Sequence, residues 1–231
     1  MNSSSSIQAV VPALNCASTI SRVVSGVKDQ GIEVLVVDDG SRDDTAARAR
    51  DAGAEVIRHP ANRGKGAALI SGFRWCLERG KRHIATLDAD GQHAPADLPR
   101  LLAIREQAPL VIGRRQIRVD PMPTSSFIGN CVSSFFISLF CGTFFPDTQC
   151  GFRIYSEELL RQVPLRGGGF ETETELLMRA ARLGLEIRWV PIQTIYTTGR
   201  ETRRTNFRTA RDSLRVIRTV LRSPLYPRSV R

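Results

Sequence analysis

The sequence lacks the cysteine patterns of a disulfide framework or a zinc site. Its five cysteines form no Cys-x-x-Cys pair, and no histidine stands at metal-ligand spacing from them. These absences argue against structural zinc and predict free thiols in a reducing compartment. The first six residues also lack the basic and apolar regions of a secretory signal. We therefore expect a cytoplasmic protein with a disordered N-terminus over residues 1–6.

Two common nucleotide-binding loops are missing as well. A dinucleotide-binding fold needs Gly-x-Gly-x-x-Gly after its first strand, but Pro12-Ala13-Leu14-Asn15 stands there, so hydride transfer is not expected. The segment Asn62-Arg63-Gly64-Lys65-Gly66-Ala67 lacks the first glycine and the Ser/Thr of a P-loop. Its lysine and helix N-terminal amides could still contact a phosphate, although a plain glycine-rich helix start explains it equally well.

Acidic residues are scarce at the end of the chain. The net charge is +10, and residues 199–231 carry ten arginines against Glu201 and Asp212. Six arginines recur every three or four residues beside an apolar stripe, at Arg204, Arg208, Arg211, Arg215, Arg218 and Arg222. The spacing predicts a basic amphipathic C-terminal helix, which either lies on an anionic membrane surface or packs on the core. Nucleic acid is not an expected partner, because no aromatic-rich recognition module accompanies the arginines.

What the sequence does contain is a regular alternation of apolar, β-branched runs with helical patterns. Hydrophobic residues make up 42% of the 231 residues, enough for the core of one large domain. The expected strands and helices span 7–14, 18–28, 32–37, 43–52, 55–58, 64–79, 83–87, 95–106 and 110–113. This alternation predicts an α/β fold with a mostly parallel sheet and helices on both faces. Ligands of such sheets bind beyond the carboxyl ends of the strands.

Polar residues stand where three of these strands end. The clusters are Pro12-Ala13-Leu14-Asn15, Asp38-Asp39-Gly40-Ser41 and Asp88-Ala89-Asp90, and we expect them to converge on one edge of the sheet. Gly40 permits a tight turn before the next helix, with Ser41 or Asp43 as its N-cap. Asp88 and Asp90 would face the same side of an extended segment, where both could bind one divalent cation and its phosphate ligands. An acidic turn is the alternative reading.

These and further motifs resemble family 2 glycosyltransferases of the GT-A fold, in particular the dolichol-phosphate mannosyltransferase-like branch. The motifs are Val36-Val37-Asp38-Asp39-Gly40-Ser41, Asn62-Arg63-Gly64-Lys65-Gly66, Asp88-Ala89-Asp90-Gly91-Gln92-His93, Ile112-Gly113-Arg114-Arg115, Asp147-Thr148-Gln149-Cys150-Gly151-Phe152-Arg153 and Phe170-Glu171-Thr172-Glu173. The match covers residues 7–215, and we place the GT-A domain at 7–198 and the basic tail at 199–231. The resemblance implies a GDP- or UDP-linked sugar donor, a Mg²⁺ or Mn²⁺ ion, and inversion at the anomeric carbon.

The resemblance also implies roles for individual residues. On the nucleobase side of the donor it places Pro12, Ala13 and Asn15, with Asp39 on the base or ribose and Lys65 in the nucleotide-sugar site. On the metal it places Asp88, Asp90 and Gln92, of which Asp88 also belongs to the donor site and Asp90 to the catalytic group. Near the donor and acceptor phosphates it places Arg114 or Arg115 together with Arg153. Arg153 is equally well explained as a structural ion-pair partner.

Two glutamates are candidates for a general base. If the acceptor is a hydroxyl, Glu171 or Glu173 would take its proton, whereas a lipid phosphate is already ionised and needs no base. The alternative is an acidic first helical turn, followed by an apolar core face that includes Leu176 and Leu177.

Two departures from the family pattern concern substrate recognition. Cys16 replaces a glutamate expected near the nucleobase, and residues 123–128 lack an arginine that would hold a lipid phosphate.

The expected function is metal-dependent sugar transfer to a lipid-linked, polyprenyl-phosphate-like or other hydroxyl acceptor, by a protein peripheral on the cytoplasmic face of a membrane. The alternatives are a degenerate family member that serves as a binding subunit, and a sugar-nucleotide nucleotidyltransferase. The latter would need a glycine-rich basic loop after the first strand.

One long segment has no charge at all. Residues 122–146 contain no charged side chain, and six of the ten phenylalanines lie between Phe127 and Phe145. A transmembrane helix needs about 20 apolar residues, so the length would suffice. A span here would separate motifs that must share one domain, so we expect a buried or interfacial helix beside the acceptor site.

Overall fold

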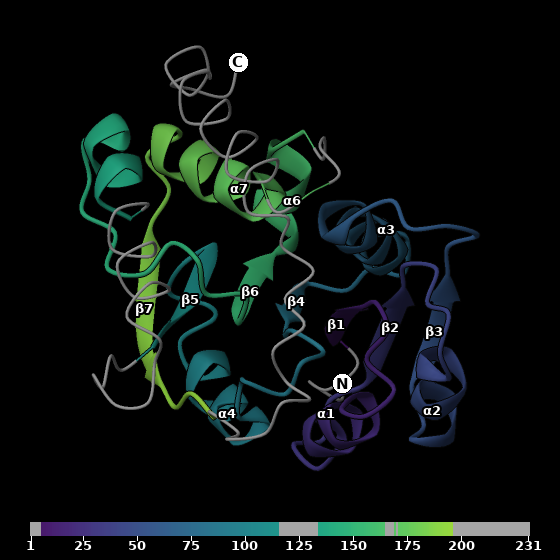
Figure 1. Ribbon diagram of the computed structural model, residues 1–231. Helices are drawn as coiled ribbons and strands as arrows, with labels where there is room; N and C mark the ends of the chain where they lie inside the picture. The colour runs from purple at the N-terminus through teal and green to yellow at the C-terminus, as the bar shows by residue number, and fades with distance from the viewer. Residues whose placement is uncertain (1–5, 116–133, 165–168, 170, 196–231) are drawn as a thin grey trace.

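The fold is built on one twisted, seven-stranded sheet. The computed structural model describes residues 6–115, 134–164, 169 and 171–195 (Figure 1). Its strands are β1 (Ile7–Ala13), β2 (Val34–Asp38), β3 (Glu55–Arg58), β4 (His83–Thr86), β5 (Leu110–Arg115), β6 (Arg153–Ser156) and β7 (Ile187–Ile192), in the order β3-β2-β1-β4-β6-β5-β7. Only β6 among these strands runs antiparallel to its neighbours, so the predicted mostly parallel sheet is confirmed.

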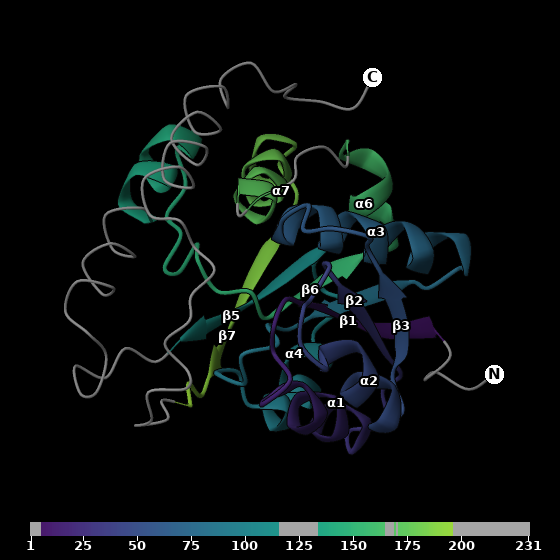
Figure 2. The same cartoon turned by 45° about the vertical axis from the view of Figure 1, so that its right-hand side comes forward.

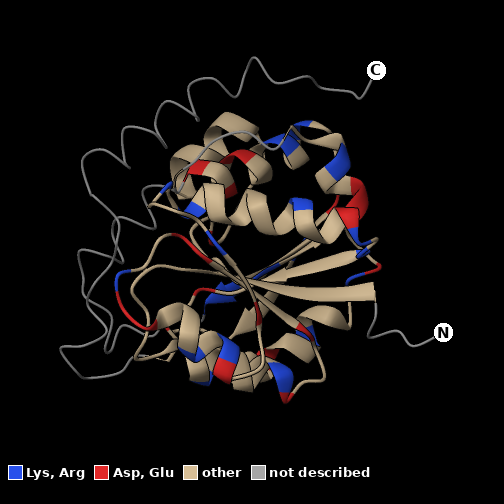
Figure 3. Cartoon of the chain, turned by 90° about the vertical axis from the view of Figure 1, so that its right-hand side faces the viewer, with Lys and Arg blue, Asp and Glu red and all other residues tan. Residues whose placement is uncertain are grey.

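Helices cover both faces of this sheet. The helices are α1 (Ile20–Lys28), α2 (Thr45–Asp51), α3 (Lys65–Glu78), η2 (Pro95–Asp97), α4 (Leu98–Leu102), α6 (Glu157–Gln162) and α7 (Glu171–Arg182). Figure 2 shows α1, α2 and α4 on one side of the sheet and α3, α6 and α7 on the other, and Figure 3 shows helices on both sides of the strands. The predicted α/β architecture with helices on both faces is therefore confirmed.

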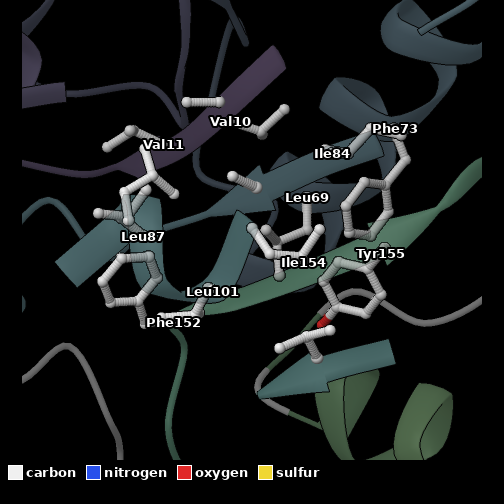
Figure 4. Packing of buried hydrophobic residues seen from close by; sticks show 14 of the residues in the cluster. Val10, Val11, Leu69, Phe73, Ile84, Leu87, Leu101, Phe152, Ile154 and Tyr155 are labelled. Atoms are coloured by element: carbon white, nitrogen blue, oxygen red, sulfur yellow. The ribbon is translucent and has the colours of Figure 1, made fainter. Parts of the chain in front are cut away.

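Buried apolar side chains fill both faces of the sheet, among them Val24 of α1 on one face and Leu69 of α3 on the other. The Phe73 ring of α3 meets the Tyr155 ring of β6 edge to face, with centroids 5.1 Å apart, and both side chains are fully buried (Figure 4). Gly72 faces Val10 of β1 so closely that an added Cβ would collide with it. The glycine therefore allows α3 to approach the sheet, and the start of α3 is held at the edge where β1, β2 and β4 end.

Several caps and elements differ from those predicted from the sequence. Asp44, rather than Ser41 or Asp43, is the N-cap of α2, because its carbonyl accepts the first helical bond, from Arg48 N, although its side chain makes no capping bond. The Asp43 carboxylate accepts from Thr45 N instead, at 3.1 Å. The helix expected over 95–106 is a 3₁₀ turn followed by α4, which ends at Leu102. Strands β6 and β7 were not among the expected elements.

The described part of the charge-free segment contains a half-buried helix over 134–141. Ile137 is buried, whereas Phe135, Phe136 and Leu139 are exposed, as is Phe144 just after the helix. Within the described ranges, no helix is both long and apolar enough to cross a membrane. Residues 1–5 of the expected disordered N-terminus and the predicted basic helix within 199–231 lie outside those ranges.

Candidate active site

A cavity of about 300 Å³ opens at the carboxyl ends of β1, β2 and β4. The three polar clusters expected at these strand ends all contribute to its wall. The other lining residues come from the start of α3, the first turn of α7 and the loop before β6. The lining comprises Pro12, Ala13, Leu14, Cys16, Asp39, Asn62, Gly64, Lys65, Ala68, Asp88, Ala89, Asp90, Thr148, Gln149, Arg153, Glu173 and Thr174.

Asp39 is held rigidly at the end of β2. Its Oδ1 accepts hydrogen bonds from Arg63 N at 2.9 Å and lies 2.7 Å from His59 Nδ1, while its Oδ2 accepts from Gly64 N at 2.7 Å. The other ring nitrogen of His59 lies 2.9 Å from the Ser71 hydroxyl. Two of the partners of Asp39 are therefore backbone amides and the third is a buried imidazole. Each carboxylate oxygen can accept two bonds, so these contacts leave one lone pair of Oδ2 for a ligand.

Lys65, the first residue of α3, connects two carboxylates across the cavity wall. Its Nζ lies 2.7 Å from Asp88 Oδ1 and 2.7 Å from Glu173 Oε2. Burial lowers the pKa of the Lys65 ammonium, but the charges of Asp88 and Glu173 outweigh burial and raise it above its usual value. Burial likewise opposes ionisation of Asp88, yet Lys65 and His93 hold the pKa of that carboxyl well below its usual range. Both Lys65 and Asp88 are therefore charged at neutral pH.

Asp90 is the second carboxylate of the predicted metal pair. Burial raises the pKa of Asp90, and the negative charge of Asp88 raises it further. Two carboxylates that oppose each other's ionisation inside one cavity are suited to a shared divalent cation. Among the described residues no three His, Cys, Asp or Glu side chains gather as a metal cluster. Asp88 and Asp90 could hold Mg²⁺ or Mn²⁺ together with the phosphates of a ligand, as one or two carboxylates do in many nucleotide sites.

Glycines make room around these charges. An added Cβ on Gly151 would lie 2.6 Å from Asp88 Oδ2, so the loop before β6 approaches Asp88 only because residue 151 has no side chain. An added Cβ on Gly66 would collide with the Thr172 hydroxyl and the Gly169 carbonyl. The start of α3, which carries Lys65, therefore packs directly against the start of α7, which carries Glu173.

Five residues expected at the site do not line the cavity. Asn15 adopts a left-handed backbone conformation (φ 53°), and its side-chain oxygen accepts from Arg42 N at 2.8 Å, so it joins the loops after β1 and β2. Arg115 makes a two-point ion pair with Asp147, at 2.8 Å for each contact, and Arg114 is exposed. The Glu171 Oε1 accepts from Gly169 N. Gln92 is half-buried beside the cavity residues Asp88 to Asp90.

Arg153 reaches the cavity wall, yet its guanidinium is used for support. It is 1% exposed, and it donates to the carbonyls of Cys150, Thr148 and Glu173 at 2.7, 2.8 and 2.8 Å. These bonds tie the loop before β6 to the first turn of α7. These partners are backbone carbonyls, not the carboxylate of the ion pair that was the alternative to a phosphate contact.

Other residues of the site were not singled out from the sequence. His59 follows β3 and has no nearby motif, so its contact with Asp39 could not be foreseen. His93, Thr148 and Gln149 stand inside motifs of the family match. Those motifs were the signal from which their place at the site could have been predicted. The His93 Nε2 lies 3.5 Å from Asp88 Oδ2. Burial raises the pKa of the Cys16 thiol to about 11, so this cavity residue is a neutral, apolar replacement for the expected glutamate.

Comparison with known protein families identifies the family to which the chain belongs. The model of Glycosyl transferase family 2 matches residues 8–163, which is more than half of the chain. The chain is a family 2 glycosyltransferase. This glycosyltransferase is 35% identical over 196 residues to an undecaprenyl-phosphate mannosyltransferase of Micrococcus luteus, a match that covers 79% of this chain and 81% of that protein.

A further relative matches the same branch, and a solved structure matches the fold. A UDP-N-acetylglucosamine–dolichyl-phosphate N-acetylglucosaminyltransferase of Methanococcus voltae is 32% identical over 225 residues, covering 87% of this chain and 90% of that protein. The glucosyl-3-phosphoglycerate synthase of Mycobacterium tuberculosis, solved with Mn²⁺ and UDP-glucose, superposes with a TM-score of 0.75 at 25% identity and covers 96% of this chain and 80% of that one. The glycosyltransferase therefore belongs to the dolichol-phosphate glycosyltransferase-like branch and has the GT-A fold, as its sequence predicts.

Proposed function

We propose that this glycosyltransferase transfers a sugar, with inversion, from a GDP- or UDP-sugar to a polyprenyl-phosphate-like lipid, and that it requires Mg²⁺ or Mn²⁺. The observation that carries the proposal is the placement of Asp88 and Asp90 in the same cavity as Asp39. One carboxylate pair suits a cation with its diphosphate, and the remaining acceptor position on Asp39 suits an N–H or O–H of the nucleoside.

The charge of the cavity supports the metal requirement. Its lining contains four carboxylates, Asp39, Asp88, Asp90 and Glu173, against the two cations Lys65 and Arg153. A diphosphate would be repelled by this excess of negative charge unless a cation enters with it. When bound, a divalent cation would neutralise the donor phosphates and stabilise the charge that grows on the leaving nucleoside diphosphate. Asp88 and Asp90 would hold it, with Lys65 beside it as a further positive charge.

Exposed apolar side chains support a lipid acceptor. Phe135, Phe136 and Leu139 of the helix over 134–141, and Phe144 after it, are 49% to 81% exposed. Ser134, the first described residue of that helix, accepts from Thr148 N, and Thr148 lines the cavity. An apolar surface so close to the cavity suits the hydrocarbon of a lipid substrate and a peripheral position on a membrane. Of the two candidate bases only Glu173 lines the cavity, and a phosphate acceptor would not require a base.

The test has a binding arm and a transfer arm. Thermal unfolding is followed with UDP- and GDP-sugars, each with and without Mn²⁺, and a metal-dependent rise in the midpoint is expected for one nucleotide class. The sugar that stabilises best is then supplied in labelled form with undecaprenyl phosphate in detergent. Label should enter the lipid fraction. A protein stabilised by none of the donors would overturn the proposal, and binding without transfer would remove the lipid acceptor from it.

A further inference from the structure

The Lys65 ammonium is the main positive charge next to two cavity carboxylates. Its 2.7 Å contacts with Asp88 Oδ1 and Glu173 Oε2 lie largely away from water, since the three side chains are 16%, 28% and 10% exposed. In such surroundings an ion pair is held firmly, and removing one partner leaves a costly unpaired charge. The pairing joins the end of β4 to the first turns of α3 and α7.

The same carboxylate is the first ligand of the proposed metal site. Lys65 contacts Asp88 Oδ1, and His93 Nε2 faces Oδ2 at 3.5 Å. A divalent cation bound to Asp88 would stand next to the positively charged Lys65 ammonium, which would repel it. Lys65 and the metal therefore compete for Asp88.

We propose that Lys65 is a positioning residue that holds Asp88 in the nucleotide-free protein and gives it up to the divalent cation when a donor diphosphate becomes the new partner of its amine. The inference rests on the proposed function. A diphosphate entering the cavity brings an anion to which the flexible lysine stem can turn. Metal and nucleotide both favour the arrangement in which Lys65 has left Asp88. Each should therefore raise the affinity for the other by the same factor.

The packing around Lys65 confines this exchange to its side chain. Gly66 lies against Thr172 and Gly169 with no room for a Cβ, so the backbone at the start of α3 cannot shift toward or away from α7 without a collision or a gap. Lys65 can therefore change partners by rotation of its four-carbon stem alone. Glu173, which stays in place, loses its ion-pair partner in the same movement.

The first experiment measures Mn²⁺ affinity by calorimetry with no nucleotide present. Lys65→Met keeps an apolar stem but removes the competing charge, and Lys28→Met is the control, since Lys28 is an exposed lysine bonded to the Gly53 carbonyl. We expect Lys65→Met to bind Mn²⁺ about 10-fold more tightly than wild type, and Lys28→Met to match wild type. The factor by which UDP or GDP strengthens Mn²⁺ binding should be smaller in Lys65→Met than in wild type, because only the coupling through direct phosphate–metal contact remains. Equal or weaker Mn²⁺ binding by folded Lys65→Met would overturn the inference.

A second measurement uses the wild-type protein, so it does not depend on the variant folding. The chain has three lysines, Lys28, Lys65 and Lys81, and amine acetylation at each can be read by mass spectrometry. Saturating Mn²⁺ should increase acetylation of Lys65 relative to the other two, and Mn²⁺ with UDP or GDP should reduce it again. Acetylation of Lys65 that does not respond to Mn²⁺ would contradict the exchange.

The two proposals fail in different ways. Wild-type protein that binds neither UDP nor GDP, with or without Mn²⁺, would remove the proposed function and this inference together. Wild-type protein that binds a nucleotide with Mn²⁺, but in which Lys65→Met leaves Mn²⁺ affinity and coupling unchanged, would remove only the role of Lys65.

Discussion

Asp39 and Asp88 both follow parallel strands and line one cavity, but their carboxylates are held differently. Asp39 is bonded to two backbone amides and to the buried ring of His59, whereas Asp88 is paired with the side chain of Lys65. Backbone amides cannot leave without unfolding a turn, while a lysine stem can rotate. If the proposed roles hold, the end of the cavity at Asp39 is preformed for the nucleoside, and the end at Asp88 rearranges when metal and nucleotide bind.

The largest expected effect on sugar transfer is at Asp90, in the proposed metal site. Asp90→Ala should reduce sugar transfer by at least about 100-fold, because the charge on the leaving diphosphate would lose part of its stabilisation. Transfer of labelled sugar at saturating Mn²⁺ measures the change. Asp51→Asn, at an exposed position in α2, is the control and should transfer normally. Normal transfer by Asp90→Ala would take Asp90 out of the site.

The next effect concerns Arg153, which ties the loop before β6 to the first turn of α7. Arg153→Met should lower the free energy of unfolding by about 3–5 kcal/mol, because three carbonyls lose buried, charged donors. Urea denaturation measures the loss. Arg114→Met removes an exposed arginine and should stay within about 0.5 kcal/mol of wild type. A small change for Arg153→Met would mean that the loop before β6 and α7 hold their places independently of it.

A pair of variants compares the two ends directly. Asp39→Asn should weaken nucleoside diphosphate binding by about 10-fold, or about 1.4 kcal/mol, and leave Mn²⁺ binding unchanged. An amide in place of the carboxylate cannot accept from all three present donors. Asp88→Asn should instead weaken Mn²⁺ binding. Calorimetry with UDP, GDP and Mn²⁺ measures both, and the division into two ends is wrong if Asp39→Asn loses Mn²⁺ affinity as well.

A smaller effect is expected at His59. His59→Leu should weaken nucleotide binding by about 1 kcal/mol, because Asp39 loses one of its three donors. His59→Asn places an N–H donor near the position of Nδ1 and should restore part of the affinity. Equal affinities for the leucine and asparagine variants would show that His59 contributes only packing.

The smallest expected effect is a dependence of the free energy of unfolding on pH. Since the pKa of Asp88 is held below its ordinary value of 3.8, the ionised carboxylate contributes stability above pH 3.8 that is lost as the pH falls below it. The difference in unfolding free energy between wild type and Asp88→Asn should therefore be constant from pH 7 to pH 5 and shrink toward pH 3. Urea denaturation across this range measures it. A difference that grows in acid would contradict the pairing with Lys65.

Local sequence determined strands β1 to β5, the helices between them and the chemical types that meet at the cavity. The runs ending at Ala13, Asp38 and Thr86 are apolar and β-branched, so they predict parallel strands, and the polar residues after them predict a site at the carboxyl edge. The motifs around Asp39 and Asp88 were sufficient to identify the family. The antiparallel β6 was not foreseen, because four residues carry little periodic signal of their own.

Tertiary structure alone decided which partners these residues take. Lys65 and Glu173 are 108 positions apart, and only the close approach of α3 to α7 at Gly66 lets the Lys65 ammonium contact Glu173 as well as Asp88. Contacts between distant segments likewise bring His59 to Asp39. They also direct the Arg153 guanidinium to three backbone carbonyls rather than to a ligand. A sequence pattern states which groups can donate or accept a bond, but the packing of the chain selects the groups that meet.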